Sequence, residues 1–338
     1  MISVFDENTW RTFVRGFTIY DCSILREQGC AFILVEEKDD RDVYPRTRFL
    51  HMALERPLDN RFGMCESGNF TFATITSSLD PGGYVAVDTA SCVYSVSAQQ
   101  MGEEKPIDEV IDMSTYGGRT GIVKKVVRAA GQVYALGDYR RIYRRIGLDA
   151  WIELGKEGCG VPLPQAAVVR SSLGFSDMSA FACGDMYAVG GEGDVWRFDG
   201  ATWHDCAFPT TADLRTVCCG GDGVVYITEM NGSVWAGHGR TWACVAEADI
   251  AAGFQPVDAA WFNNRLYLGG MEGLWALDRE EKRLVPLQDV EADAPNATNG
   301  GRLDVSPDGR FLLTAGPFGA CLHDGNGWRR LFSAFDFL

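Results

Sequence analysis

The sequence is short of the residues from which metal and redox centres are built. It contains 4 histidines among 338 residues, and no two of its 11 cysteines form a Cys-x-x-Cys pair. Structural zinc sites draw on closely spaced Cys and His ligands, so no zinc site is expected. The odd number of cysteines also disfavours a disulfide framework, and we interpret them as small buried residues of a reducing compartment. We expect no cofactor and no metal ion.

Basic residues are scarce relative to acidic ones. Lys and Arg number 31 against 46 Asp and Glu, which leaves a formal net charge of −15 at pH 7. Surfaces that bind nucleic acid or anionic membranes need an excess of Lys and Arg, so neither is expected as a partner. A basic protein partner matches this charge better.

Long hydrophobic segments are also missing. No stretch approaches the roughly 18 apolar residues that a transmembrane helix needs. The first residues, MISVFDENTWRTF, have neither the basic start nor the apolar centre of a secretory signal. We therefore expect a cytoplasmic protein.

What the sequence does contain is a repeated pattern of glycines and aromatic residues. Residues 178–207 (MSAFACGDMYAVGGEGDVWRFDGATWHDCA) hold four short β-branched or aromatic runs between glycine-rich turns, and similar units recur at 220–243 and 263–278. Glycine supplies the positive φ of tight hairpin turns, and short apolar runs between such turns predict strands. A four-stranded unit repeated at about 40 residues is typical of a β-propeller.

The spacing of aromatic residues supports one repeated unit. The second-strand aromatic precedes the third-strand aromatic by nine residues in three units: Tyr134 and Tyr143, Tyr187 and Trp196, Tyr226 and Trp235. Glycine and asparagine clusters interrupt the chain every eight to ten residues, which leaves no helical periodicity. We predict an all-β fold in a single domain, a β-propeller with seven blades of four antiparallel strands.

The blades are expected at 17–58, 70–108, 122–154, 175–206, 214–245, 256–287 and 302–331. The first is the weakest, because the charged residues after its strand at 30–35 carry no repeat signature. Six blades are therefore the alternative. Residues 2–13 match the second half of a blade and are interpreted as one or two strands that close the ring.

The repeat resembles those of kelch-type and WD-repeat propellers. Tyr-Ala-Val-Gly-Gly at 187–191 places paired glycines where kelch repeats carry theirs, and 305–312 is similar to the strand entry of WD repeats. The turn before Trp196 is shorter than in kelch repeats, and no Trp-Asp dipeptide ends a blade. The chain also resembles bacterial propellers that serve as immunity proteins of secreted polymorphic toxins. That resemblance implies a non-enzymatic protein that binds and inhibits a cognate toxin, although a shared fold does not establish an activity.

Patterns of catalytic residues are weak. Residues 198–203 (FDGATW) carry only the end of a sialidase-type box and are interpreted as a turn between strands. The inner strands offer only Arg128 and Asp258 as charged residues, too few for a calcium site. His204 and Cys206 are two residues apart, which we interpret as a surface histidine beside an outer-strand cysteine. We expect no enzyme and no catalytic residues.

A protein-binding surface is expected on the rim where the turns between second and third strands emerge. Loops on a rigid scaffold commonly carry recognition, and carboxylates mixed with Tyr, Met and Phe suit a protein interface. The expected partner-binding residues are Asp138, Tyr139, Arg140, Glu192, Asn231, Met271, Glu272 and Phe318. The basic run 140–145 (RRIYRR) is interpreted as a solvated turn with local salt bridges, with an anchor for an acidic partner patch as the alternative.

The leading hypothesis is therefore a non-enzymatic, protein-binding propeller, and most specifically an immunity protein that binds a basic toxin. One alternative is a hydrolase or lyase that acts on a sugar at the central channel. Another is a scaffold that joins larger assemblies.

Overall fold

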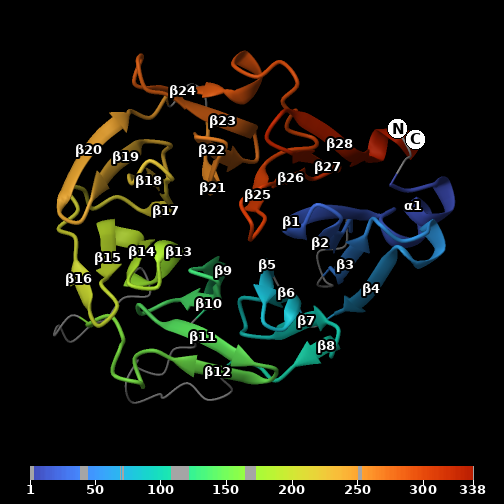
Figure 1. Ribbon diagram of the computed structural model, residues 1–338, viewed down its shortest axis with the longest axis horizontal. Helices are drawn as coiled ribbons and strands as arrows, with labels where there is room; N and C mark the ends of the chain where they lie inside the picture. Colours follow the sequence, from blue (N-terminus) through green and yellow to red (C-terminus); the bar gives the residue numbers. More distant parts are fainter. Residues whose placement is uncertain are drawn as a thin grey trace.

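Seven four-stranded sheets surround a central axis (Figure 1). A computed structural model of the chain describes residues 4–38, 45–68, 70, 72–107, 122–163, 173–249 and 253–337. In each sheet the strands follow chain order, and neighbouring strands pair antiparallel. The predicted all-β propeller with seven blades is confirmed, and the six-bladed alternative is wrong.

The strands of the seven blades occupy the following residues. Blades 1 and 2 hold β1 (Phe17–Arg26), β2 (Gly29–Glu36), β3 (Thr47–Ala53), β4 (Phe62–Ser67), β5 (Thr74–Leu79), β6 (Gly82–Val87), β7 (Val93–Ser97) and β8 (Met101–Glu104). Blades 3 and 4 hold β9 (Val123–Ala129), β10 (Gln132–Gly137), β11 (Ile142–Gly147), β12 (Ala150–Glu153), β13 (Phe175–Ala182), β14 (Asp185–Gly190), β15 (Asp194–Phe198) and β16 (Trp203–Asp205). Blades 5 to 7 hold β17 (Leu214–Cys219), β18 (Val225–Glu229), β19 (Val234–His238), β20 (Thr241–Ala246), β21 (Pro256–Phe262), β22 (Arg265–Gly270), β23 (Gly273–Asp278), β24 (Arg283–Pro286), β25 (Arg302–Val305), β26 (Leu312–Gly316), β27 (Gly319–His323) and β28 (Trp328–Ser333). The first blade thus extends past the expected end at 58.

Second strands are buried on both faces because each blade packs between two neighbours. In β14 every residue after Asp185 is buried, and in β22 every residue after Arg265 is buried. The repeated tyrosines belong to this core, with Tyr187 at 0 % and Tyr267 at 1 % exposure. Strand β14 ends at Gly190, where glycine is needed because a Cβ would collide with the carbonyl of Gly174. The repeated Tyr-x-x-Gly pattern therefore reflects packing between and within blades.

In the described part of the chain, the N-terminal segment is a helix and not closing strands. Glu7–Phe13 form α1, so the interpretation of this segment as strands is wrong; residues 2 and 3 lie outside the described residues. The Asp6 carboxylate accepts the backbone N–H of Thr9 at 2.7 Å, and the Thr9 hydroxyl accepts the N–H of Asp6 at 2.9 Å. This reciprocal capping box satisfies two N–H groups that a helix start otherwise leaves unpaired.

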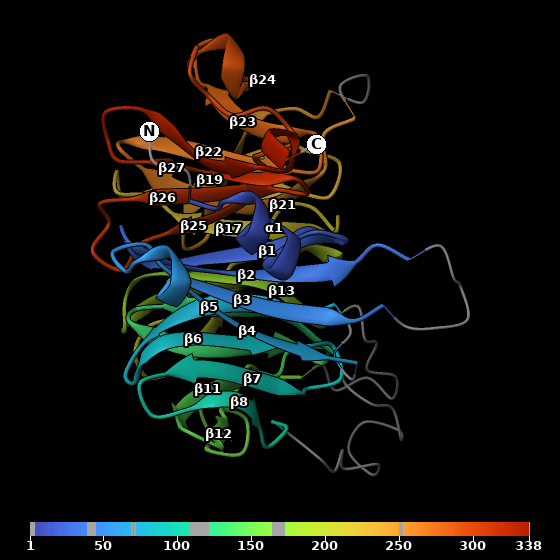
Figure 2. The same cartoon turned by 90° about the vertical axis from the view of Figure 1, so that its right-hand side faces the viewer.

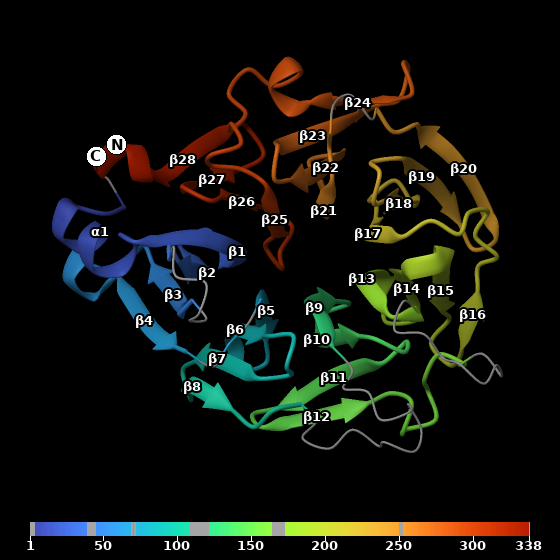
Figure 3. The ribbon, with the colours of Figure 1, turned by 180° about the vertical axis from the view of Figure 1, so that it is seen from behind.

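Among the described residues, the first and last blades exchange no strand where the ring closes. Blade 1 begins at β1 and blade 7 ends at β28, and each consists of its own four consecutive strands. Helix α1 lies across the seam between these blades in front and back views (Figures 1 and 3). Five aromatic residues join there in an aromatic clasp: Phe5, Trp10, Phe62, Phe332 and Phe337. Side-chain packing and hydrogen bonds such as Ile19 N–H to the Pro317 carbonyl (3.0 Å), rather than a shared sheet, close the circle.

The strands of each blade run between the two faces of the ring, as the side view shows (Figure 2). The turns between second and third strands lie at the same end as the start of each inner strand; Gly190, for example, pairs with both Phe175 and Asp194. We call this end, which also carries the connections between blades, the loop end. Short 3-10 turns complete the structure: η1 (Leu58–Asn60), η3 (Gly191–Gly193), η4 (Leu287–Asp289) and η5 (Ala334–Phe337). Within the described ranges no helix is long and apolar enough to cross a membrane.

Candidate functional site

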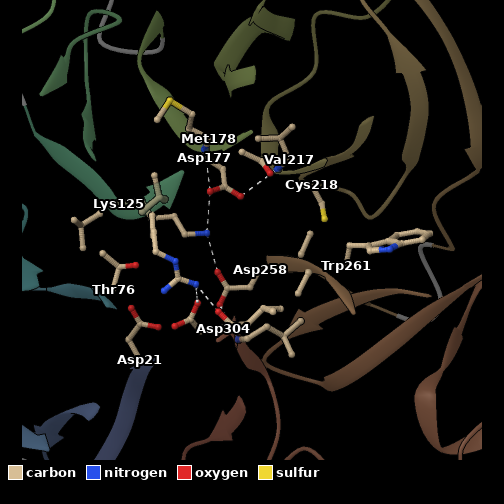
Figure 4. Close-up of a pocket in the computed structure, with 18 of the residues that line it drawn as sticks. Asp21, Thr76, Lys125, Asp177, Met178, Val217, Cys218, Asp258, Trp261 and Asp304 are labelled. Carbon is tan, nitrogen blue, oxygen red and sulfur yellow. Dashed lines mark hydrogen bonds and ion pairs between the residues drawn. The ribbon is translucent and has the colours of Figure 1, made fainter. Parts of the chain in front are cut away.

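Charged side chains gather on the inner strands at the centre of the ring (Figure 4). They surround a polar cavity of about 240 Å³. We call the set the channel cluster; Asp21, Lys125, Arg128, Asp177, Asp258 and Asp304 line the cavity, and Arg302 belongs to the set through its contact with Asp258. They come from blades 1, 3, 4, 6 and 7, so only the closed ring brings them together.

Lys125 links two blades across the cavity. Its Nζ lies 2.8 Å from Asp258 Oδ1 and 3.1 Å from Asp177 Oδ1 (Figure 4). Burial disfavours the lysine charge, but the two carboxylates outweigh burial and raise the pKa of Lys125 above its ordinary value. Arg302 and Arg128 lie 3.7 Å from Asp258 and 3.6 Å from Asp304 respectively. The cations of the cluster are thus held by its own carboxylates.

The carboxylates also bind the backbone of the next blade. Inner strands are sheet edges, and their outward N–H groups have no strand partner. Four aspartates each accept one such N–H from the following blade: Asp21 from Ile75 (2.9 Å), Asp177 from Val217 (3.1 Å), Asp258 from Leu303 (3.2 Å) and Asp304 from Ile24 (2.8 Å). The channel cluster therefore fastens neighbouring blades to one another.

Burial shifts the pKa of the Asp21 carboxyl toward the neutral range. Burial raises the pKa of its carboxyl to about 6; Arg302 opposes the shift, and Asp258 adds to it. A carboxyl with such a pKa is suited to proton transfer. The cavity of about 240 Å³ is nevertheless smaller than ligand pockets of roughly 300–1,000 Å³. Among the described residues no group of three or more Cys, His, Asp or Glu side chains could hold a metal ion.

Most of this charge was not predicted from the sequence. Only Arg128 and Asp258 were expected as charged residues of the inner strands, because the inner strands of blades 3 and 4 were predicted to begin too late. The structure starts β9 at Val123 and β13 at Phe175, which brings Lys125 and Asp177 into the channel. A signal was available: the third residue of an inner strand is polar in blades 3 to 7, as Lys125, Asp177, Thr216, Asp258 and Asp304.

His204 and its neighbours do not form a catalytic relay. The Nε2 atom of His204 lies 2.7 Å from Asp199 Oδ2 and 3.0 Å from Thr202 Oγ1. A relay uses one ring nitrogen for the acid and the other for the nucleophile, whereas here both contacts share one nitrogen. Cys206 is 1 % exposed, and burial raises the pKa of its thiol to about 12. Asp199 accepts the backbone N–H groups of Ala201 and Thr202, which confirms that 198–203 is a turn.

The structure places all eight expected partner-binding residues in turns between second and third strands at the loop end. Five of them have exposed side chains: Glu192, Asn231, Met271, Glu272 and Phe318. Asp138 and Tyr139 are only 5 % and 2 % exposed, so their side chains are not available to a partner in this structure. Their turn folds inward, and Lys124 lies 3.2 Å from the Asp138 carboxylate.

The basic run 140–145 forms a turn and the start of β11 and makes salt bridges, but it is not solvated, because each of its side chains is buried or half-buried. Half-buried Arg140 contacts the Asp194 carboxylate of the next blade through Nε (2.7 Å) and Nη2 (2.7 Å). Arg145 is buried and donates to both oxygens of Glu104, at 2.6 and 2.8 Å. These arginines join blades 2, 3 and 4, which leaves Arg140 and Arg145 committed to the protein's own carboxylates.

Comparison with known proteins finds a relative of this chain. No protein-family model matches the chain. The chain is 32 % identical over 161 residues to Immune protein Tsi7 of Pseudomonas aeruginosa. The matched region is 48 % of this chain and 50 % of that protein, so the chain spans about half the length of its relative. The resemblance to propeller-type immunity proteins is confirmed at this level.

Two solved structures share the fold. The WD40 β-propeller domain of Doa1 superposes with a TM-score of 0.57 at 9 % identity, over 93 % of this chain and 92 % of its own. Virginiamycin B lyase of Staphylococcus aureus superposes with a TM-score of 0.59 at 10 % identity, over 93 % and 94 %. At such low identity these similarities show the propeller architecture, and they transfer no activity.

Proposed function

We propose that this chain is a non-enzymatic immunity protein, which binds a protein toxin and blocks its action. The observation that carries the proposal is the 32 % identity to Immune protein Tsi7 over 161 residues. Because that match covers half of each protein, the toxin and the mode of inhibition are both part of the proposal.

Two features of the molecule support a binding role. The first is that the charged groups of the channel serve the fold: the cations of the channel cluster pair with its own carboxylates, and its four aspartates accept backbone N–H groups of the next blade. The loop end, in contrast, presents exposed apolar side chains such as Met271 and Phe318. With a net charge of −15, the protein attracts a basic partner.

The proposal is tested by protection and by complex formation. The product of the gene adjacent to that of this chain is expressed in a bacterial host, alone and together with this chain. We expect growth to be restored by co-expression, and a one-to-one complex of the two purified proteins. The WD40 domain of Doa1, which shares only the fold, is the control and should not protect. Toxicity that persists beside well-expressed, folded protein, with no complex formed, would contradict the proposal.

A hydrolase or lyase acting on a sugar in the channel is the second candidate. Its support is the Asp21 carboxyl, which has a pKa of about 6 and lines a polar cavity. The Asp21→Asn variant separates the two functions. An immunity protein keeps its protective effect in this variant, whereas cleavage of a panel of sugar polymers that is lost on substitution would favour the enzyme. The third possibility, a scaffold that joins larger assemblies, would be favoured if the chain were recovered in a stable assembly of several different proteins.

A further inference from the structure

An apolar groove lies at the seam where the ring closes. It has a volume of about 450 Å³ and is lined by α1, the start of β1, the turn between β26 and β27, and the C-terminal 3-10 turn η5. Its floor consists of four apolar side chains that are 3–8 % exposed: Trp10, Val14, Phe17 and Ile19. We call it the seam groove. Its volume falls within the roughly 300–1,000 Å³ that is typical of binding pockets.

Two exposed phenylalanines form one wall of the seam groove. Phe318 is 37 % exposed and Phe335 is 56 % exposed, and their ring centroids are 5.9 Å apart. Single exposed apolar residues are normal on a protein surface, but an aromatic pair beside a pocket is typical of a contact site. The same patch therefore carries an apolar ridge and an apolar hollow.

The charges at the seam groove are balanced, unlike those of the whole chain. Its lining includes one cation, Arg15, and one anion, Glu37, and both side chains are exposed. Both residues lie next to Gly16, whose carbonyl accepts the Glu37 N–H at 2.9 Å. Arg15 donates to the Phe337 carbonyl at 3.4 Å, and within the described ranges neither side chain has an ion-pair partner. Each charge is thus available to a partner.

The charge of the chain favours a second copy as the occupant. Residues 10–19, which form the floor, include Arg11 and Arg15 but no Asp or Glu, so this face does not attract a basic partner. The net charge of −15 makes two copies repel each other. Two copies can therefore meet at small electrostatic cost on a face where cations and anions are balanced.

The shape of the patch also fits a second copy. A two-fold interface brings the same patch of both subunits together, so the patch must be complementary to itself. A ridge beside a hollow meets this condition, because each ridge can enter the hollow of the other copy. One cation beside one anion meets it as well.

We propose that two copies of this chain form a two-fold symmetric dimer through the seam groove. Phe318 and Phe335 of each copy enter the groove of the other, and Arg15 of each copy faces Glu37 of the partner subunit. The inference goes beyond the proposed function and does not depend on it. Because the groove is small compared with obligate interfaces, we expect a dissociation constant on the order of 10 μM.

Sedimentation equilibrium of the full chain tests the apolar contact. Wild type should change from a monomer at about 1 μM to a dimer at about 200 μM. Phe318→Asp should raise the dissociation constant about 10-fold or more, because it puts a charge into the hollow. Phe181→Asp is the matched control: Phe181 is also 37 % exposed, but it lies near the end of β13, away from the loop end. This control should stay within about twofold of wild type.

A charge exchange tests the two-fold arrangement. Arg15→Glu places two anions on each copy and Glu37→Arg places two cations, so each variant alone opposes like charges across the interface and should be monomeric at about 200 μM. An equimolar mixture of the two variants pairs opposite charges at both contacts. It should dimerise again, which a pair within one chain would not produce.

The outcomes are distinct. Wild type that remains monomeric at about 200 μM overturns the proposal. So does a Phe318→Asp variant that dimerises like wild type, a control that loses as much affinity, or a mixture of charge variants that stays monomeric. If wild type is monomeric and Phe318→Asp no longer binds the purified product of the adjacent gene, the groove receives the toxin instead. All four substituted side chains are exposed, so circular dichroism and melting temperature of the variants should match wild type.

Discussion

Removal of the Trp10 side chain should weaken the seam of the ring. Trp10 is 5 % exposed and stacks on Phe337 with ring centroids 4.7 Å apart. Its other ring contacts are Phe5 at 5.5 Å and Phe332 at 6.0 Å, so it touches both the N-terminal and C-terminal parts of the aromatic clasp. Truncation of a buried tryptophan to alanine typically costs about 3–5 kcal/mol.

That cost is large relative to the whole stability of a domain, about 5–15 kcal/mol. Helix α1 has 7 residues, too few to persist without tertiary contacts. The Trp10→Ala variant should therefore lose stability and also release α1 from the seam. Urea unfolding followed by circular dichroism should show a loss of about 3–5 kcal/mol. Limited trypsin digestion should cut the variant faster after Arg11 and Arg15.

Phe335 provides the control for this prediction. It lies in the C-terminal turn at the same seam but is 56 % exposed. Phe335→Ala should lower the unfolding free energy by less than about 1 kcal/mol, as is usual for exposed side chains. If Trp10→Ala is as stable as this control and keeps the wild-type digestion pattern, the reasoning about ring closure is refuted.

The other predictions concern ionised groups between blades. Lys125→Met should destabilise the fold by about 3 kcal/mol in urea unfolding, because two buried carboxylates lose their common cation; no change would contradict the bridging role. Arg145→Ala should cost a similar amount because the buried Glu104 carboxylate loses its cation and keeps only neutral donors such as the Asp149 N–H, and a double-mutant cycle with Glu104→Gln should show coupling. Folding raises the Asp21 pKa from 3.8 to about 6, so the folded state binds this proton more tightly. The stability from Asp21 is thus fully present below pH 4 and is lost as pH rises through 6, about 3 kcal/mol in all. The unfolding free energy of Asp21→Asn relative to wild type should therefore rise by that amount between pH 4 and pH 7. A difference in stability that does not change with pH would contradict the raised pKa.

Much of the blade structure is local and was therefore predictable. A strand such as β14 is defined by its own apolar run, and the turn after it by Gly190 and Gly191. The first blade was harder because β3 follows a charged segment that lacks these signals. The N-terminus was misread because Trp10 falls seven residues after Ser3, the spacing of Trp203 from Trp196. The Asp6-x-x-Thr9 capping box was a stronger local signal for the helix.

Exposure at the rim depended on the fold of each turn. The sequence located the second-to-third turns, and Met271 and Glu272 are exposed there. Tyr139 occupies an equivalent turn, but its backbone has a φ of 60°, and its side chain is buried. Which way a turn side chain points follows from packing between blades, and that packing is not encoded by the turn residues alone.

The sequence by itself determined a repeated four-stranded unit, since turn glycines and apolar runs act within a few residues, and it favoured seven copies over six. Only the tertiary structure decided which charges meet. Lys125 and Asp258 lie 133 residues apart and approach to 2.8 Å only because the ring places blade 3 opposite blade 6. Trp10 finds Phe337 for the same reason, since a closed circle makes neighbours of the two ends of the chain.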